Sequence, residues 1–210
     1  MDSKRLEAFS DGVFAVAITI LALNLAVPGP GHGPLAAQLA GHWPSFAAYL
    51  VSFLTIGIIW VNHHALFKSI AHVDRGLLFF NLVLLFFVVA IPFATSTNAV
   101  YLRHAGSDAS VAAALFQGVL EGMSLSFAGL FWWSLRRQHL ELALTRAQTR
   151  RAIVRFGAGN IAYLVAIGIA FASAPASLLI SGLIAAYYAF EQTPAKPAAI
   201  DDPPQHTRPP

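Results

Sequence analysis

The stretch Arg5-Leu6-Glu7-Ala8-Phe9-Ser10-Asp11-Gly12 leads directly into an apolar run from Val13 to Val27. Together they predict a helix that is long and apolar enough to cross a bilayer. Asp11 lies at the threshold of this helix, where an ionisable group is costly unless it has a partner. The stretch therefore predicts a membrane helix with a functional site in its first turns.

The composition of the whole chain is typical of an integral membrane protein, since 57% of its residues are hydrophobic and only 11% are charged. Six apolar segments are separated by Pro, Gly or charged residues, and the last two are joined by the tight turn Ser173-Ala174-Pro175-Ala176. The segments are 7–27, 43–67, 76–98, 110–135, 152–173 and 175–190. We expect an all-α fold with one unit of six transmembrane helices over residues 1–190, followed by a disordered cytoplasmic tail over 191–210.

The basic residues predict the orientation. Of the 13 Lys and Arg residues, only Arg103 falls on one side of the membrane under this assignment, so the positive-inside rule places both termini in the cytoplasm. We expect the arginine-rich stretch 136–155 to be a cytoplasmic linker that favours the anionic inner leaflet. The basic residues do not gather on a soluble face, which excludes a nucleic-acid partner.

Other classes of protein are disfavoured by specific absences in the sequence. The chain has no cysteine, which excludes disulfides and thiolate metal sites. It has no nucleophile elbow and no His-Glu-x-x-His pattern, so we do not expect an enzyme. An N-terminal signal peptide is the alternative for the first segment, but Glu7 and Asp11 lie in or beside it and no clean cleavage site precedes Pro28. We expect the first helix to be retained.

One face of the first helix carries Val16, Ile20 and Leu23, with Thr19 at its edge, while Asp11 points about 140° away from Val16. In a membrane helix an apolar face contacts lipid or protein equally well, and periodicity does not distinguish these from a pore.

The pattern Arg5-x-x-x-Phe9-Ser10-Asp11 with its continuation over residues 12–21 resembles the first-helix signature of the bacterial branch of the transmembrane protein 175 potassium channels. The resemblance covers about residues 1–190. It implies a subunit of six helices in the bacterial plasma (inner) membrane, and a homotetramer whose pore is lined by the first helix. The chain has no Thr-Val-Gly-Tyr-Gly run, so the filter loop of ordinary potassium channels is missing.

The resemblance also implies residue roles. Val16 matches the narrowest apolar layer of the pore, Ile20 and Leu23 match the next layers outward, and Thr19 matches a hydroxyl position implicated in selectivity. Val16 departs from the family pattern, which usually has Ile or Leu there. The implied mechanism is passive conduction of potassium through a hydrophobic gate, with potassium bound only transiently and without cofactors or a resident metal.

For the polar residues around the first helix we hypothesise a cluster that fixes the rotation of this helix. Asp11 and Ser10 are expected to meet side chains from the ends of the second and third segments, where indole, imidazole and amide groups satisfy one another. Arg5 lies at the cytoplasmic mouth, pairs with acidic neighbours, or serves only as a positive-inside anchor. The proposed members are Arg5, Ser10, Asp11, Trp60, His63, His64 and Asn81.

The alternative function is a proton- or cation-coupled secondary transporter. In that case Asp11, His63, His64 and Glu121 would act as relay groups within the membrane. The two halves of the sequence show no similarity to each other, which disfavours a transporter built on inverted repeats.

Overall fold

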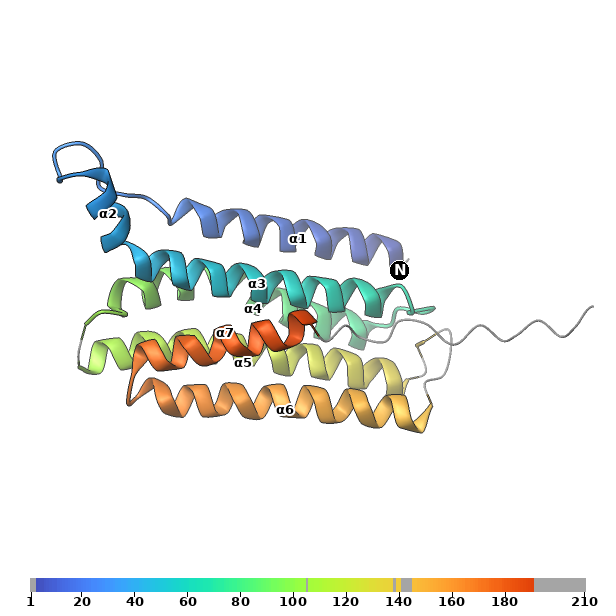
Figure 1. Cartoon of the computed structure of the whole chain (residues 1–210). Coiled ribbons are helices and arrows are strands. Elements are labelled where there is room, and N and C mark those ends of the chain that lie inside the picture. Colours follow the sequence, from blue (N-terminus) through green and yellow to red (C-terminus); the bar gives the residue numbers. More distant parts are fainter. Residues whose placement is uncertain (1–2, 105, 138, 141–144, 191–210) are drawn as a thin grey trace, which may run out of the picture.

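The computed structural model of the chain describes residues 3–104, 106–137, 139–140 and 145–190, which form seven helices and no β-sheet (Figure 1). The all-α prediction is therefore confirmed. The helices are α1 (Ser3–Leu23), α2 (Leu35–Gly41), α3 (Trp43–Phe67), α4 (Arg75–Tyr101), α5 (Ser107–Arg136), α6 (Arg146–Ala170) and α7 (Ala174–Phe190). The predicted tail over 191–210 lies outside the described residues.

Five of these helices, α1, α3, α4, α5 and α6, are long and apolar enough to span a membrane. The remaining apolar helix, α7, has 17 residues, which corresponds to about 25 Å and is shorter than a typical hydrocarbon core. The structure thus gives five helices of spanning length, and the sixth span remains a prediction. The tight turn before α7 is present, and there the Ala176 N–H donates to Ser173 Oγ at 3.3 Å.

The structure differs from the predicted segments at three places. The first helix ends at Leu23 instead of Val27, and the short helix α2 in the following connection was not expected. The stretch 136–155 is not a linker throughout, because α6 already begins at Arg146. The reason is a capping box, in which Thr145 and Gln148 exchange side-chain to backbone hydrogen bonds.

The two longest helices, α4 and α5, pack closely through aromatic side chains that lie against glycines. A Cβ atom at Gly122 would lie 2.2 Å from the Phe87 ring, and one at Gly129 would lie 2.9 Å from the Phe80 ring. Both pairs are seven residues apart along their helices, so they repeat the same contact two turns further on. The missing Cβ atoms let α4 and α5 form the centre of the bundle.

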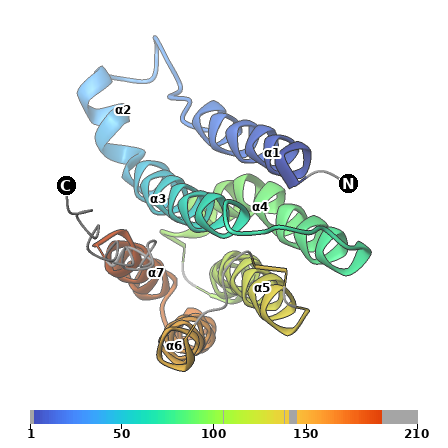
Figure 2. The ribbon, with the colours of Figure 1, turned by 90° about the vertical axis from the view of Figure 1, so that its right-hand side faces the viewer.

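The outer helices flank this pair on opposite sides, as the end view in Figure 2 shows. On one side α1 packs on α3 and α4, and on the other α6 packs on α5 and α7. Of the five long helices, α6 is the least buried, at 17% of its apolar window, whereas α5 is buried at 56%. The bundle therefore leaves one face of α1 and most of α6 for contacts outside the subunit.

Candidate functional site

The first helix divides into a buried and an exposed face. The buried face packs on α3 and α4 and consists of Leu6, Ser10, Phe14, Ala17 and Leu21. On the opposite face Val16 is 55% exposed, Ile20 is 40% exposed and Leu23 is 79% exposed. Thr19 is exposed between them. All four residues assigned to a pore by resemblance thus lie on the surface of the single subunit that its own helices leave uncovered.

The Thr19 hydroxyl donates a hydrogen bond to the Val16 carbonyl oxygen, one turn earlier in α1, at 2.8 Å. The hydroxyl oxygen therefore keeps its lone pairs for another donor or for a cation.

A groove runs beside this exposed face, where α1 meets α4. It has a volume of about 380 Å³. Its lining is entirely apolar and consists of Phe9, Val13, Leu82, Leu85, Phe86, Val89 and Ala90.

Behind the buried face, a fully buried chain of hydrogen bonds joins α1, α3 and α4. The Asn81 amide NH2 donates to Ser10 Oγ at 3.0 Å, and Ser10 in turn donates to the Leu6 carbonyl at 2.9 Å. On its other side the Asn81 amide oxygen lies 2.8 Å from His63 Nε2, which is therefore the donor. Asn81 thus holds the three helices together through a single amide group.

The His63 ring is held between two phenylalanines. Its centroid lies 4.1 Å from that of Phe67, in a stacked arrangement, and 5.3 Å from that of Phe14 on α1. The imidazole therefore has a fixed orientation, with Nε2 directed at Asn81.

Nearer the surface, α1 and α3 are joined by a second pair of polar contacts. Trp60 Nε1 donates to Asp11 Oδ1 at 2.9 Å, and His64 Nδ1 lies 2.7 Å from Glu7 Oε1. The Trp60 and His64 rings are stacked, with centroids 5.9 Å apart. Asp11 therefore binds the indole, and no hydrogen bond joins it to either histidine within the described part of the chain.

Two residues deviate from the expected cluster. Sequence reasoning missed Glu7, although its position four residues before Asp11 places it on the same helix face. Arg5 is exposed, and no described residue forms an ion pair with it. Glu7, Asp11 and His64 each place one ligand atom within 4.8 Å of the others, a spacing that suits a cation. Both carboxylates already have a partner within the protein, since His64 contacts Glu7 and Trp60 donates to Asp11.

Glu121 of the transporter alternative is buried on α5, with 5% exposure, and its Oε2 has no partner among the described residues. None of the contacts above connects it to Asp11, His63 or His64, so these groups do not form one continuous relay in the described structure.

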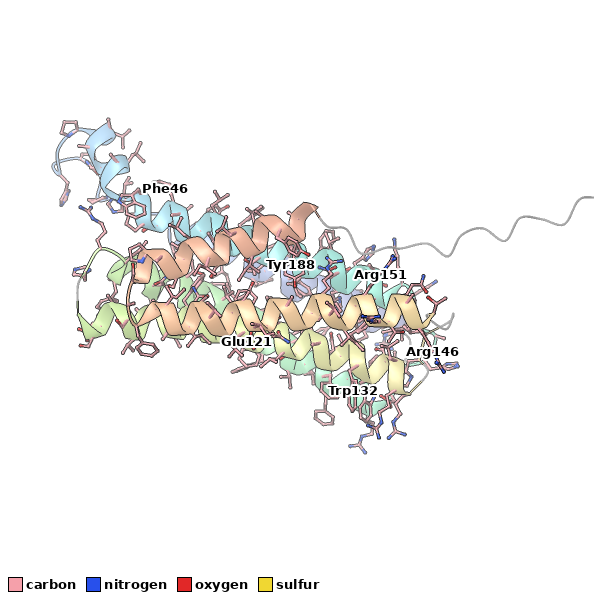
Figure 3. The ribbon with its side chains drawn as sticks, turned by 60° about the horizontal axis from the view of Figure 1, so that its bottom comes forward. Phe46, Glu121, Trp132, Arg146, Arg151 and Tyr188 are labelled. Atoms are coloured by element: carbon pink, nitrogen blue, oxygen red, sulfur yellow. The ribbon has the colours of Figure 1, made fainter. Side chains whose placement is uncertain are left out.

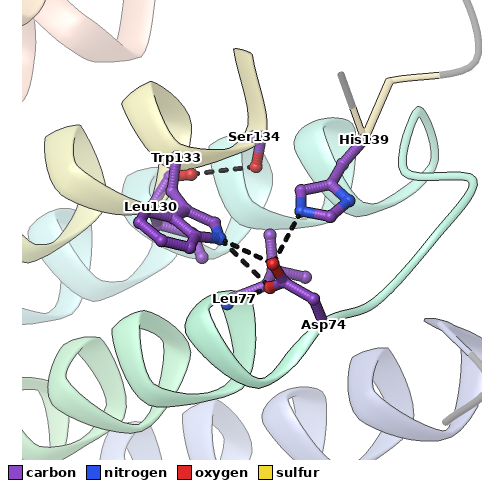
Figure 4. A network of polar contacts seen from close by, with 6 residues as sticks. All are labelled: Asp74, Leu77, Leu130, Trp133, Ser134 and His139. Atoms are coloured by element: carbon purple, nitrogen blue, oxygen red, sulfur yellow. Dashed lines mark hydrogen bonds and ion pairs between the residues drawn. The ribbon is translucent and has the colours of Figure 1, made fainter. Parts of the chain in front are cut away.

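A further polar network, also missed from the sequence, joins the start of α4 to the end of α5 (Figure 4). Asp74 caps α4 by accepting from the Leu77 N–H at 2.7 Å, and it accepts from Trp133 Nε1 at 3.0 Å. His139 Nε2 lies 3.3 Å from Asp74 Oδ2. Burial raises the pKa of Asp74, but the hydrogen bonds from Leu77 and Trp133 and the nearby His139 outweigh this effect and lower the pKa below its ordinary value.

Comparison with known proteins identifies similar chains along almost the whole length. The family described as endosomal/lysosomal potassium channel TMEM175 matches residues 5–92. A potassium channel of Streptomyces collinus is 48% identical over 195 residues, which are 92% of this chain and 94% of that protein. The endosomal/lysosomal proton channel TMEM175 of Rattus norvegicus is 30% identical over 177 residues, 79% of this chain and 33% of that protein.

A solved structure supports the same assignment. The crystal structure of a lysosomal potassium-selective channel TMEM175 homolog from Chamaesiphon minutus superposes with a TM-score of 0.79 at 34% identity. The match covers 89% of this chain and 96% of that one.

Proposed function

Since the chain belongs to the TMEM175 channel family, we propose that it is a potassium-permeable channel of the bacterial plasma membrane that conducts passively through a pore lined by α1. The observation that carries this proposal is the division of α1 into two faces. Its polar residues bind α3 and α4, while Val16, Ile20 and Leu23 stay uncovered.

A single helix cannot enclose a pore, so α1 must meet copies of itself around a symmetry axis. We propose a homotetramer in which the exposed face of α1 lines the axis. The apolar groove between α1 and α4 lies directly beside that face and is suited to receive an apolar helix of the neighbouring subunit. Both the uncovered face and the groove are then explained by one assembly.

The gate of this pore consists of rings of Val16, Ile20 and Leu23, which lie within about 10 Å along the helix axis. Rings of such side chains exclude water when they are close together and admit ions after a small dilation. Thr19 lies within this set, and its hydroxyl oxygen replaces part of the water shell of a passing potassium ion. Because the chain lacks a carbonyl-ring filter, we expect modest selectivity.

The polar cluster sets the rotation of α1 around its own axis. Ser10 and Asp11 bind α4 and α3 through Asn81 and Trp60, and they point about 120° and about 140° away from the Val16 direction, so the apolar face is turned outward. In this proposal the cluster positions the gate without contacting the ion.

The topology follows the charge bias. The described basic residues other than Arg103 lie at the end of the bundle where α1 begins, and we propose that this end is cytoplasmic and that α7 is the sixth span.

The test is to make the gate polar. Ile20→Asn should wet the constriction and increase potassium flux into reconstituted vesicles. The matched control is Ile161→Asn, because Ile161 is 64% exposed on α6, on the far side of the bundle from α1. An equal rise in the control, or unchanged flux from an intact Ile20→Asn assembly, would refute the gate. Single-channel current steps in a planar bilayer would exclude the transporter alternative, since carriers turn over too slowly to give them.

A further inference from the structure

We propose that the first two turns of α6 bind an anionic phospholipid, with the lipid phosphate held between Arg146 and Arg150. The site is a groove of about 320 Å³ on the helix surface, lined by Arg146, Thr149, Arg150, Ile153 and Val154. Its chemistry changes within two turns from guanidinium and hydroxyl donors to aliphatic side chains.

The arrangement of these residues matches the structure of a phospholipid. Arg146 and Arg150 lie on one side of α6 one turn apart, and Ile153 lies about 10 Å along the axis from Arg146. Ile153 is 57% exposed and Val154 is 62% exposed, so the apolar end of the groove is open. A phosphate at the arginines therefore places the first part of an acyl chain against Ile153 and Val154. A free phosphate ion would leave these two residues uncovered, which favours a lipid.

Two tryptophans mark the depth of the site. Trp132 and Trp133 lie near the end of α5, and tryptophan side chains gather at the level of the lipid headgroups. The Arg136 guanidinium lies 5.1 Å above the Trp132 ring and the Arg137 guanidinium 4.9 Å above the Trp133 ring. Figure 3 shows Arg146 and Trp132 at the same end of the bundle, so the groove opens at the level where phosphates lie.

The charge of this segment is unbalanced. The first ten residues of α6 contain Arg146, Arg150, Arg151 and Arg155 and no acidic residue. Within the described part of the chain, neither Arg146 nor Arg150 forms an ion pair. Guanidinium groups bind phosphate through two parallel hydrogen bonds, and the positive end of the α6 dipole adds to the attraction.

The position of α6 in the bundle leaves the groove open to lipid. α6 packs on α5 and α7, on the side away from α1, and it is the least buried of the long helices. If α1 lines the central axis, as in the proposed function, α6 lies at the periphery of the assembly. α6 begins at the same end of the bundle as α1, so the groove faces the cytoplasmic leaflet under the topology of that same proposal.

The test is lipid binding by native mass spectrometry of the full-length protein in a neutral detergent. Phosphatidylglycerol should bind more tightly than phosphatidylcholine with the same acyl chains. Arg150→Gln should weaken phosphatidylglycerol binding about 5-fold, the effect of one arginine near a membrane surface. The matched control is Arg151→Gln, because Arg151 is the next residue and exposed but does not line the groove. It should change the binding less than 2-fold.

Three results would overturn the site. Equal losses in Arg150→Gln and Arg151→Gln would show unspecific attraction to a basic segment. Equal binding of both lipids would remove the role of the phosphate charge. Competition by millimolar inorganic phosphate, with no effect of Ile153→Ser, would show a free-anion site. If Arg150→Gln does not fold, Arg150→Lys takes its place in the comparison with Arg151→Gln, because lysine keeps the charge but loses the paired hydrogen-bond geometry. Lipid binding is measured without ion flux, so its failure is distinguishable from failure of the gate.

Discussion

Replacing Asn81 by alanine tests whether one amide group holds α1, α3 and α4 together. Asn81 is fully buried, donates to Ser10 on α1 and accepts from His63 on α3. The variant loses both hydrogen bonds and leaves His63 Nε2 without its partner. Because these two hydrogen bonds join α4 to α1 and α3, the expected effect is on stability and on the attachment of α1.

The size of the effect follows from these contacts. Each hydrogen bond between membrane helices contributes about 0.6 kcal/mol on average, and a buried donor left unsatisfied costs about 1–3 kcal/mol. We therefore expect Asn81→Ala to lower the free energy of unfolding by about 2–4 kcal/mol. The matched control is Asn98→Ala, because Asn98 lies on the same helix and is equally buried, but its amide has no partner among the described residues.

The measurement is unfolding by sodium dodecyl sulfate in mixed micelles, followed by tryptophan fluorescence. Asn98→Ala removes the same atoms and leaves a similar cavity, but it breaks no hydrogen bond, so its loss should stay below about 1 kcal/mol. The difference between the two variants isolates the contribution of the Asn81 contacts. A loss in Asn98→Ala as large as that in Asn81→Ala would show that the cavity, and not the hydrogen bonding, determines the result.

Two further predictions concern α4 and α5. Gly122→Val should destabilise the protein by at least about 1–3 kcal/mol, because the added Cβ would lie 2.2 Å from the Phe87 ring, whereas Gly118→Val, with no atom within 4 Å of its Cβ, should melt close to the wild type. Equal melting temperatures of the two variants would contradict the close packing. The pKa of Asp74 is lower in the folded state, so its contribution is complete above about pH 4 and is lost as the pH falls through the folded pKa. Asp74→Asn should therefore flatten the acid side of a stability curve against pH, and an unchanged acid slope would show that Asp74 does not contribute.

The sequence predicted the parts of the fold that depend on apolar length. Three predicted boundaries lie within a few residues of the observed ones: the end of α3 at Phe67, the start of α4 at Arg75 and the end of α5 at Arg136. Charged residues interrupt the apolar runs at these places. The start of α6 was missed because Arg146, Arg150 and Arg151 lower the hydropathy of a segment that is nonetheless helical. Local hydrogen bonds of Thr145 and Gln148 decide this boundary, and a hydropathy pattern does not report them.

The contacts around α1 were accessible from the sequence only in part. Ser10, Asp11, Trp60, His63 and Asn81 were grouped by depth, and the structure brings Asn81 to Ser10 and Trp60 to Asp11. The partner of each histidine was not accessible, because His63 and His64 are adjacent and the choice depends on the rotation of α3. Asp74 and His139 lie 65 positions apart, so only the packing of α4 on α5 brings them together.

The hydrogen bonds between α1 and its neighbours are confined to one end of the helix. In the described structure they arise from residues up to Asp11, and the buried side chains of α1 beyond it, Phe14, Ala17 and Leu21, form no hydrogen bonds. A tilt of α1 therefore pivots near Asp11. For a tilt of about 5°, Val16 moves sideways by about 0.7 Å and Leu23 by about 1.6 Å, because they lie about 7.5 Å and 18 Å from the pivot. If α1 lines the pore as proposed, this tilt moves the Leu23 ring more than twice as far as the Val16 ring, so the Val16 ring is the part of the gate that widens least.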